Sequence, residues 1–275
     1  LDQMEEVIMY EGPHTIAAIV LVGFLAASGE ARPGTSLVLA AVGLWGANHR
    51  LTTRPETVAT LLLVLSIVIL LRPMTRLSVV AWLAIVVVWI NVHPSALLAP
   101  ALAGLAGAGH LVSGTDGARR ECLRRWGLAI AGSLALLANP WGLEGILAPL
   151  RLARMVSSGL FVNMEWTATR LADFPLLFVV APIAFLFMLG SPQRRAFAPR
   201  TILLGVLGYL AFRYVRNHGF FFAAMPLLVA PALPRQISDR ISTIAAAAIL
   251  AFVVFNQGGI RTGSDPAQFP VASVA

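Results

Sequence analysis

The stretch AWLAIVVVWINVHPS (residues 81–95) decides the fold of this chain. Its first ten residues are apolar and carry no charge, as expected of a helix in lipid or in a protein core. The run then ends on Asn91 and His93, two residues apart, just before Pro94. These polar residues either mark a membrane surface or belong to a site. The choice depends on where the other polar residues of the chain lie.

Composition places the chain outside the class of water-soluble domains. It is 58% hydrophobic and 12% charged, with a mean hydropathy of +0.80. Soluble domains carry about 25% charged residues. A water-soluble fold would leave too little polar surface to cover the core, so the sequence predicts an integral membrane protein. The single cysteine, Cys122, excludes an internal disulfide and a thiolate metal cluster.

Apolar runs bounded by charges, prolines or glycines recur along the chain. Several are shorter than the roughly 20 residues that cross a bilayer alone. Their succession, almost free of internal charge, still predicts an all-α, polytopic transmembrane bundle of about ten helices within residues 14–256. The predicted spans are residues 14–28, 35–47, 57–71, 77–90, 95–112, 126–138, 174–190, 201–212, 219–233 and 241–255.

Charge distribution predicts the orientation of this bundle. The formal net charge is +7, and all 20 basic residues are arginines. If the loops alternate between two sides, twelve of these arginines fall on the side opposite the N-terminus. By the positive-inside rule that side is cytoplasmic, so the basic balance indicates membrane orientation and no nucleic-acid partner. Most amide and carboxylate side chains then face the extracytoplasmic side.

Three segments lie outside the predicted spans. The outer loop of residues 139–173 contains an amphipathic stretch, residues 145–156, with Arg151 and Arg154 opposite an apolar face, which predicts an interfacial helix. Residues 257–275 are rich in Gly, Pro and Ser and are predicted to form a flexible tail. Residues 1–13 are acidic, the reverse of a signal peptide, and we expect them to end an outer loop that begins upstream.

An arginine cluster on the extracytoplasmic side is the first candidate site. Arg213 and Arg216 lie three residues apart, and His218 follows just before three phenylalanines. Arginines in this arrangement can grip a phosphate beside a lipid chain. They are equally typical of snorkelling side chains in an aromatic belt. Arg54 adds a third arginine at a helix end on the same side.

Two further groups could complete a site. Asn91 and His93 can orient a hydroxyl or accept a proton, although a histidine at a helix end is often only an interfacial residue. Glu165 and Trp166 place a carboxylate beside an indole, which suits a general base and a sugar-stacking surface or an ordinary solvated loop. The histidines show no metal-ligand spacing such as HExxH, so the sequence assigns no metal.

The order of several short motifs resembles a known superfamily. Along the chain stand RPE (residues 54–56), WINVH (89–93), NPWG (139–142), EW (165–166) and RNHGFFFAAMP (216–226). Over roughly residues 5–234 this succession resembles the GT-C superfamily, bacterial multi-pass glycosyltransferases that use polyprenyl-phosphate-linked sugars. The resemblance implies an outer-face active site with an acidic base or metal ligand in the first outer loop. Its first helix and catalytic Asp would precede this chain, leaving Glu5 and Glu6 at the end of that loop.

The resemblance implies sugar transfer from a polyprenyl-phosphate carrier to an envelope acceptor at the outer face of a bacterial plasma membrane. The expected partners are the bilayer and the lipid-linked sugar; no cofactor is assigned, and a divalent metal is left open. The expected phosphate-binding residues are Arg54, Arg213, Arg216 and His218, and the expected sugar- and acceptor-orienting residues are Asn91, His93, Glu165 and Trp166. A transporter or flippase for a lipid-linked or anionic solute, or a non-catalytic scaffold, stays open as an alternative.

Overall fold

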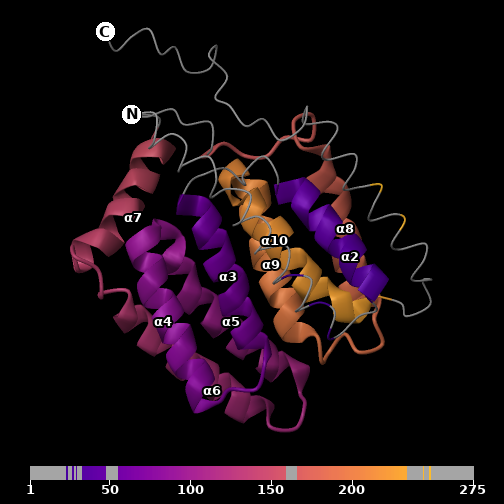
Figure 1. The fold of residues 1–275 in the computed structure, drawn as a ribbon, viewed down its shortest axis with the longest axis horizontal. Coiled ribbons are helices and arrows are strands. Elements are labelled where there is room, and N and C mark those ends of the chain that lie inside the picture. The colour runs from indigo at the N-terminus through magenta and orange to yellow at the C-terminus, as the bar shows by residue number, and fades with distance from the viewer. Residues whose placement is uncertain are drawn as a thin grey trace, which may run out of the picture.

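The computed structural model describes residues 33–47, 55–158 and 166–233, with the single positions Gly23, Ala27, Gly29, Ile244 and Ala248. Across these ranges the chain is all-helical and contains no strand, which confirms the predicted all-α class for this part (Figure 1). The elements are α2 (Pro33–Ala47), α3 (Pro55–Leu71), α4 (Arg76–Val92), η2 (Pro94–Leu97), α5 (Leu98–Ser113), α6 (Ala118–Ala135), α7 (Leu143–Ser157), α8 (Pro175–Gly190), α9 (Ala198–Arg213), η4 (Val215–Asn217), α10 (His218–Val229) and η5 (Ala230–Ala232).

Most of the described helices are too short to cross a bilayer by themselves. One stretch among the described residues, Pro94–Ser113, is long and apolar enough to cross a bilayer by itself. Four others are equally apolar but shorter: Gly34–Ala47, Pro55–Leu71, Arg76–Val92 and Pro175–Gly190. Most of the first and last predicted spans, the acidic segment 1–13 and the tail 257–275 lie outside the described residues.

Contacts between helix ends define two poles of the bundle. At one pole, Arg216 in η4, directly before α10, contacts Glu56 at the start of α3. Asn91 near the end of α4 likewise donates to the Ala138 carbonyl just after α6, with an Nδ2–O distance of 2.8 Å. At the other pole, Arg200 near the start of α9 donates to the Leu227 carbonyl late in α10. The positions of these helix ends agree with the alternation of loops that the charge count assumes.

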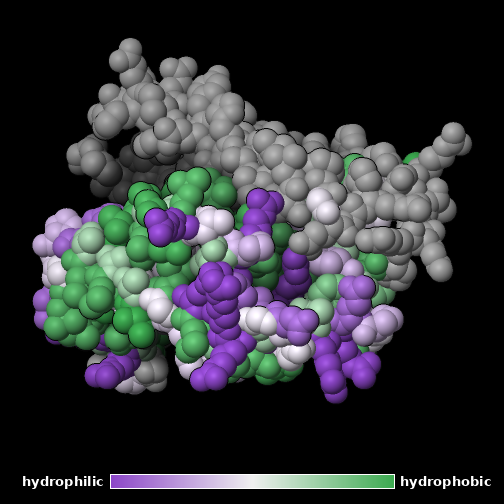
Figure 2. All heavy atoms as spheres, turned by 90° about the horizontal axis from the view of Figure 1, so that it is seen from below, coloured by the Kyte–Doolittle hydropathy of each residue, from purple (hydrophilic) through white to green (hydrophobic). Residues whose placement is uncertain are grey.

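Apolar side chains cover much of the outer flank as well as the core. Figure 2 shows hydrophilic residues across the middle of one face and a broad hydrophobic area to one side. Large apolar residues more than half exposed occur on several helices: Val80, Val88, Ile130, Leu134, Val179, Leu186 and Leu189. Exposed apolar residues therefore occur on α4, α6 and α8 as well as in the broad hydrophobic area of this face.

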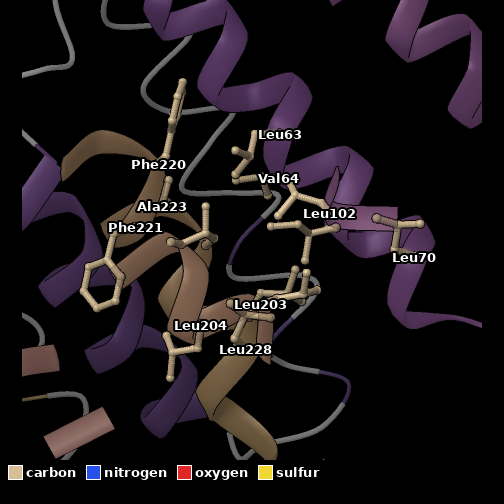
Figure 3. Packing of buried hydrophobic residues seen from close by; sticks show 14 of the residues in the cluster. Leu63, Val64, Leu70, Leu102, Leu203, Leu204, Phe220, Phe221, Ala223 and Leu228 are labelled. Atoms are coloured by element: carbon tan, nitrogen blue, oxygen red, sulfur yellow. The ribbon is translucent and has the colours of Figure 1, made fainter. Parts of the chain in front are cut away.

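The core lies where α3, α5, α9 and α10 meet. In Figure 3, Leu63 and Val64 of α3 and Leu102 of α5 face Leu203 of α9 and Leu228 of α10. All five side chains are inaccessible to solvent. Close packing of these side chains holds the four helices together.

Small residues let neighbouring helices approach closely. A Cβ atom on Gly43 of α2 would lie 2.6 Å from the carbonyl oxygen of Phe222 in α10, and one on Gly46 would overlap the Phe222 ring. Between α6 and α4, a Cβ on Gly132 would lie 2.7 Å from a ring carbon of Trp82. Side chains larger than hydrogen do not fit at these positions without a shift of the neighbouring helix.

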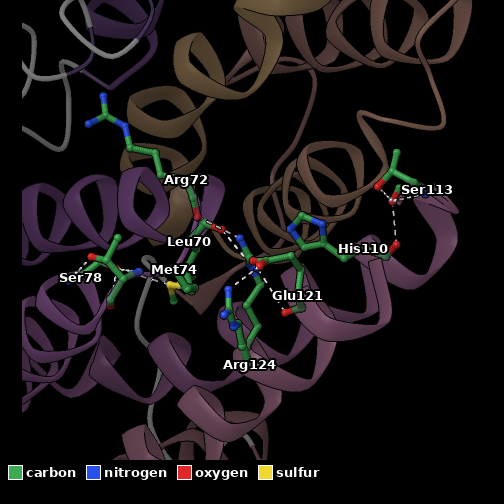
Figure 4. Close-up of polar contacts among 11 residues, drawn as sticks. Leu70, Arg72, Met74, Ser78, His110, Ser113, Glu121 and Arg124 are labelled. Atoms are coloured by element: carbon green, nitrogen blue, oxygen red, sulfur yellow. Dashed lines mark hydrogen bonds and ion pairs between the residues drawn. The ribbon is translucent and has the colours of Figure 1, made fainter. Parts of the chain in front are cut away.

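Helix α6 begins earlier than the predicted span of residues 126–138, because its arginine-rich first turns are helical too. The guanidinium of Arg125, only 1% exposed, donates to the Leu70 and Arg72 carbonyls at the end of α3. It also pairs with Glu121, which bonds Arg124 as well, as the network in Figure 4 shows. A buried charge needs such partners, and here it caps carbonyls that the end of α3 leaves unpaired.

This network makes stability depend on pH. Burial raises the pKa of the Glu121 carboxyl, but hydrogen bonds and attraction from Arg125 and Arg124 outweigh it, and the net pKa lies below its usual 4.5. The pKa of Glu121 is lower in the folded protein than in the unfolded chain. The ion pairs of Glu121 with Arg125 and Arg124 therefore stabilise the fold fully above pH 4.5, and this stabilisation is lost as the pH falls through the folded pKa.

We expect Glu121→Gln to lower the thermal unfolding midpoint at pH 7 and to bring the variant close to wild type at acidic pH. Circular dichroism melts of both proteins in detergent across this pH range measure the difference. If the difference between the two unfolding midpoints stayed the same down to the lowest pH measured, this role for the carboxylate would be contradicted.

Candidate functional site

A cavity of about 910 Å³ opens at the pole where α3, η2 and α10 begin and α4 and α9 end. Its polar lining consists of Glu56, Thr60, His93, Ser95, Glu144, Tyr214, Arg216 and Asn217, and its apolar lining includes Leu97, Leu98, Trp141, Ala148, Leu152 and Phe220. Cavities of this size hold small molecules or part of a lipid. The division into polar and apolar parts suits an amphiphile.

Arg216 is the cation of this cavity, and two groups hold it in place. Its Nη2 lies 3.2 Å from Oε1 of Glu56, and its guanidinium carbon lies 4.6 Å from the ring centre of Trp166. Both ionised side chains are mostly shielded, with Arg216 21% and Glu56 17% exposed. Stacking on an indole orients the guanidinium plane, so its remaining N–H groups point in defined directions.

His93 lies beside this ion pair with a defined tautomer. The backbone N–H of Ser95 donates to His93 Nδ1 over 3.1 Å, so Nδ1 is an acceptor and the proton of the neutral ring is on Nε2. That Nε2 lies 3.7 Å from Oε1 of Glu56. Ser95 Oγ also contacts Nδ1 and accepts from Trp89 Nε1, which fixes the ring. The site therefore presents one N–H donor from His93.

Backbone pairing places Trp166 next to Arg216. The N–H of Thr169 donates to the Phe212 carbonyl, and the N–H of Val215 donates to the Thr167 carbonyl, with distances of 3.0 and 3.1 Å. The segment around Trp166 therefore runs along the end of α9 and the start of η4. Trp166 also meets Tyr214 edge-on, with ring centroids 5.7 Å apart.

Helix α7 forms one apolar wall of the cavity. The amphipathic stretch predicted at residues 145–156 is helical, and the helix is slightly longer, Leu143–Ser157. It follows a tight turn in which Gly142 has φ +52° and the Asn139 side chain bonds the backbone of Leu136, Trp141 and Gly142. In Figure 1, α7 lies at the outer edge of the bundle. Leu143 and Met155 are exposed there, as expected of a helix with an apolar outer surface.

Three predicted site residues lie near the cavity without lining it. Arg213 is exposed, and its guanidinium carbon lies 4.8 Å over the Tyr214 ring. Asn91 donates to two backbone carbonyls and joins α4 to the end of α6. His218 is 1% exposed, with Nε2 2.8 Å from Thr169 Oγ1, so it holds the start of α10 in place. The structure thus brings together His93, Trp166 and Arg216, and gives Arg213, Asn91 and His218 other contacts.

The remaining predicted site residues, Glu5, Glu6, Arg54 and Glu165, lie outside the described residues. In contrast, the sequence analysis assigned no role to Glu56, which proves central to the cavity. An acidic residue in the first turn of a helix is common because it interacts favourably with the helix dipole, so its presence alone carried little information. The only available signal was its position on the same predicted side as His93 and Arg216.

Across residues 33–47, 55–158 and 166–233, no three His, Cys, Asp or Glu side chains gather in a way that could hold a metal ion. Comparison with known proteins yields no matching family model and no curated protein whose sequence matches this chain. The function is therefore inferred from the cavity itself.

Proposed function

We propose that this chain is a polytopic membrane protein of the bacterial plasma membrane whose cavity binds a lipid phosphate at the extracytoplasmic surface and serves glycosyl transfer. The observation that carries the proposal is the joint position of Arg216, His93 and Trp166 at the polar end of an otherwise apolar cavity. A guanidinium, an N–H donor and an aromatic face are suited to a phosphate with an attached sugar.

Exposed apolar residues support the membrane location. Ile130, Leu134 and Leu186 are each about two-thirds exposed, on helices that contain few charges in their middle. In water such a surface would cause aggregation, whereas in a bilayer it contacts lipid chains. The shorter helices suit a bundle in which flanking segments and interfacial residues complete the crossing.

The reaction proposed for this cavity is glycosyl transfer. In this reaction the acceptor oxygen forms a bond to the anomeric carbon, and the bond from that carbon to the phosphate oxygen breaks. The electron pair leaves with the lipid phosphate, and the acceptor proton passes to a carboxylate, for which Glu5 and Glu6 remain the candidates. Arg216 would stabilise the charge that grows on the departing phosphate.

A surface site agrees with the geometry better than a transport pathway. The cavity lies at one pole, and below it the core between α3, α5 and α10 is filled by Leu63, Leu102 and other fully buried side chains. At the opposite pole, Arg125 and its partners occupy the space between α3 and α6. A transporter would instead place polar groups along the bundle.

Binding of a short amphiphilic phosphate tests the proposal. We expect decyl glucosyl phosphate to raise the thermal unfolding midpoint of the protein in nanodiscs, because a ligand at about a hundred times its Kd adds about 2.7 kcal/mol of stability. Decyl glucoside is the matched control, since it has the same chain and sugar without the charge. No stabilisation by decyl glucosyl phosphate, or equal stabilisation by decyl glucoside, would contradict a phosphate site.

A further inference from the structure

We infer that Glu56 makes the cavity selective for amphiphiles whose phosphate is esterified to a hydroxyl-bearing head, and that it disfavours simple alkyl phosphates. This inference rests on the proposed function, because it assumes that Arg216 receives the phosphate. It assigns Glu56 as a specificity-determining residue.

The charge balance at the polar end of the cavity centres on Glu56. The contacts of Arg216 and His93 converge on a single oxygen, Oε1 of Glu56, at 3.2 and 3.7 Å. Arg216 and Glu56 cancel in charge, and Nδ1 of His93 accepts from the backbone N–H of Ser95. An approaching anion therefore meets a pair with no net charge, and Glu56 competes with it for Arg216.

A bound phosphate would lie close to the Glu56 carboxylate, because both groups contact the same guanidinium. Two anions at short range repel each other strongly in a partly shielded site, and Glu56 is only 17% exposed. A phosphate without further groups would thus bind weakly. A hydroxyl donor on the same head group can offset the repulsion between the phosphate and Glu56.

A hydroxyl attached near the phosphate can donate to Glu56 while the phosphate accepts from Arg216. The carboxylate then exchanges its bond from Arg216 for a bond from the ligand, and no buried acceptor is left unpaired. Hydrogen bonds to ionised acceptors are the strong ones, which gives this exchange a large effect on affinity. The Trp166 ring, held against Arg216, offers an apolar face to the same head.

The hydroxyl-bearing head has two possible sources, a lipid-linked sugar and a glycerol-bearing membrane lipid. Three phosphodiesters with equal charge and equal chains distinguish them: decyl glucosyl phosphate, decyl glyceryl phosphate and decyl methyl phosphate. We expect both hydroxyl-bearing diesters to bind wild-type protein in nanodiscs about tenfold or more tightly than the methyl diester. The tighter of the two identifies the source.

Substitution of the carboxylate tests its role directly. In Glu56→Gln, which keeps the shape and removes the charge, we expect the methyl diester to bind several-fold more tightly and the preference for hydroxyl-bearing heads to fall to about threefold or less. Glu56→Ala removes the acceptor as well and should lose the preference entirely. Asp173→Asn is the control, because it removes the same charge from an exposed residue at this pole that does not line the cavity.

The outcomes separate the two proposals. If none of the phosphodiesters binds, the proposed function fails and this inference fails with it. If they bind and depend on Arg216, but Glu56→Gln and Glu56→Ala keep the wild-type preference, only the role of Glu56 is overturned.

Discussion

Arg216→Ala is expected to weaken binding of decyl glucosyl phosphate by about 10- to 100-fold, the range for loss of a hydrogen-bonded charge partner. The substitution removes the cation that the phosphate would contact. It also leaves Glu56 without the partner at 3.2 Å and Trp166 without the guanidinium stacked on it. Isothermal titration in nanodiscs measures the effect, and an unchanged thermal midpoint of the unliganded variant shows that the fold is intact.

Arg213→Ala is the matched control for this prediction. It removes the same charge three residues earlier, from a side chain that is exposed over Tyr214 and does not line the cavity. We expect a change of less than about threefold, from the long-range field alone. Arg216→Lys should give an intermediate loss, since lysine keeps the charge without the planar fork. Equal binding by wild type and Arg216→Ala would rule out Arg216 as the phosphate ligand.

Gly109→Ala is expected to destabilise the bundle by about 1–3 kcal/mol, the usual cost of overpacking a tight contact. Gly109 lies where α5 meets the start of α9, and a Cβ there would overlap the Cα of Pro199 and lie 2.7 Å from its nitrogen. These are backbone atoms, so no side-chain rotation can relieve the overlap. Helices α5 and α9 would have to separate at this pole.

Gly104→Ala on the same helix provides the comparison. A Cβ there would have only the Ala129 Cβ nearby, at 4.0 Å. Alanine should therefore fit and, through its higher helix propensity, leave stability equal or slightly higher. Thermal unfolding in detergent measures both variants. A midpoint of Gly109→Ala equal to that of Gly104→Ala would show that α5 and α9 are not in tight contact at this position.

Helix positions could be predicted because each depends on local sequence. The apolar runs at residues 57–71, 77–90 and 174–190 correspond closely to α3, α4 and α8, since run length and flanking polar residues are properties of neighbouring residues. The start of α6 was predicted too late. Its first turns are polar, and only the contact of Arg125 with the end of α3 explains why they are helical and partly buried there.

The candidate site could be predicted only in part. The sequence predicts that His93, Trp166 and Arg216 lie on the same side of the bundle, and all three line one cavity. Spacing along the chain could not distinguish Arg216 from Arg213, because both lie near the end of one helix. A turn of η4 directs Arg216 toward Glu56 and leaves Arg213 over Tyr214.

The sequence by itself determined that the described part of the chain is helical, where most of its helices lie and which of their ends share a pole. These features follow from hydropathy and charge along short segments. Only the tertiary structure decided that Glu56 meets Arg216, 160 residues away in the chain, and that His93 lies beside them. The reason is physical: helix rotation and packing set which side chains face one another, and these depend on contacts among α3, α9 and α10 that no single segment encodes.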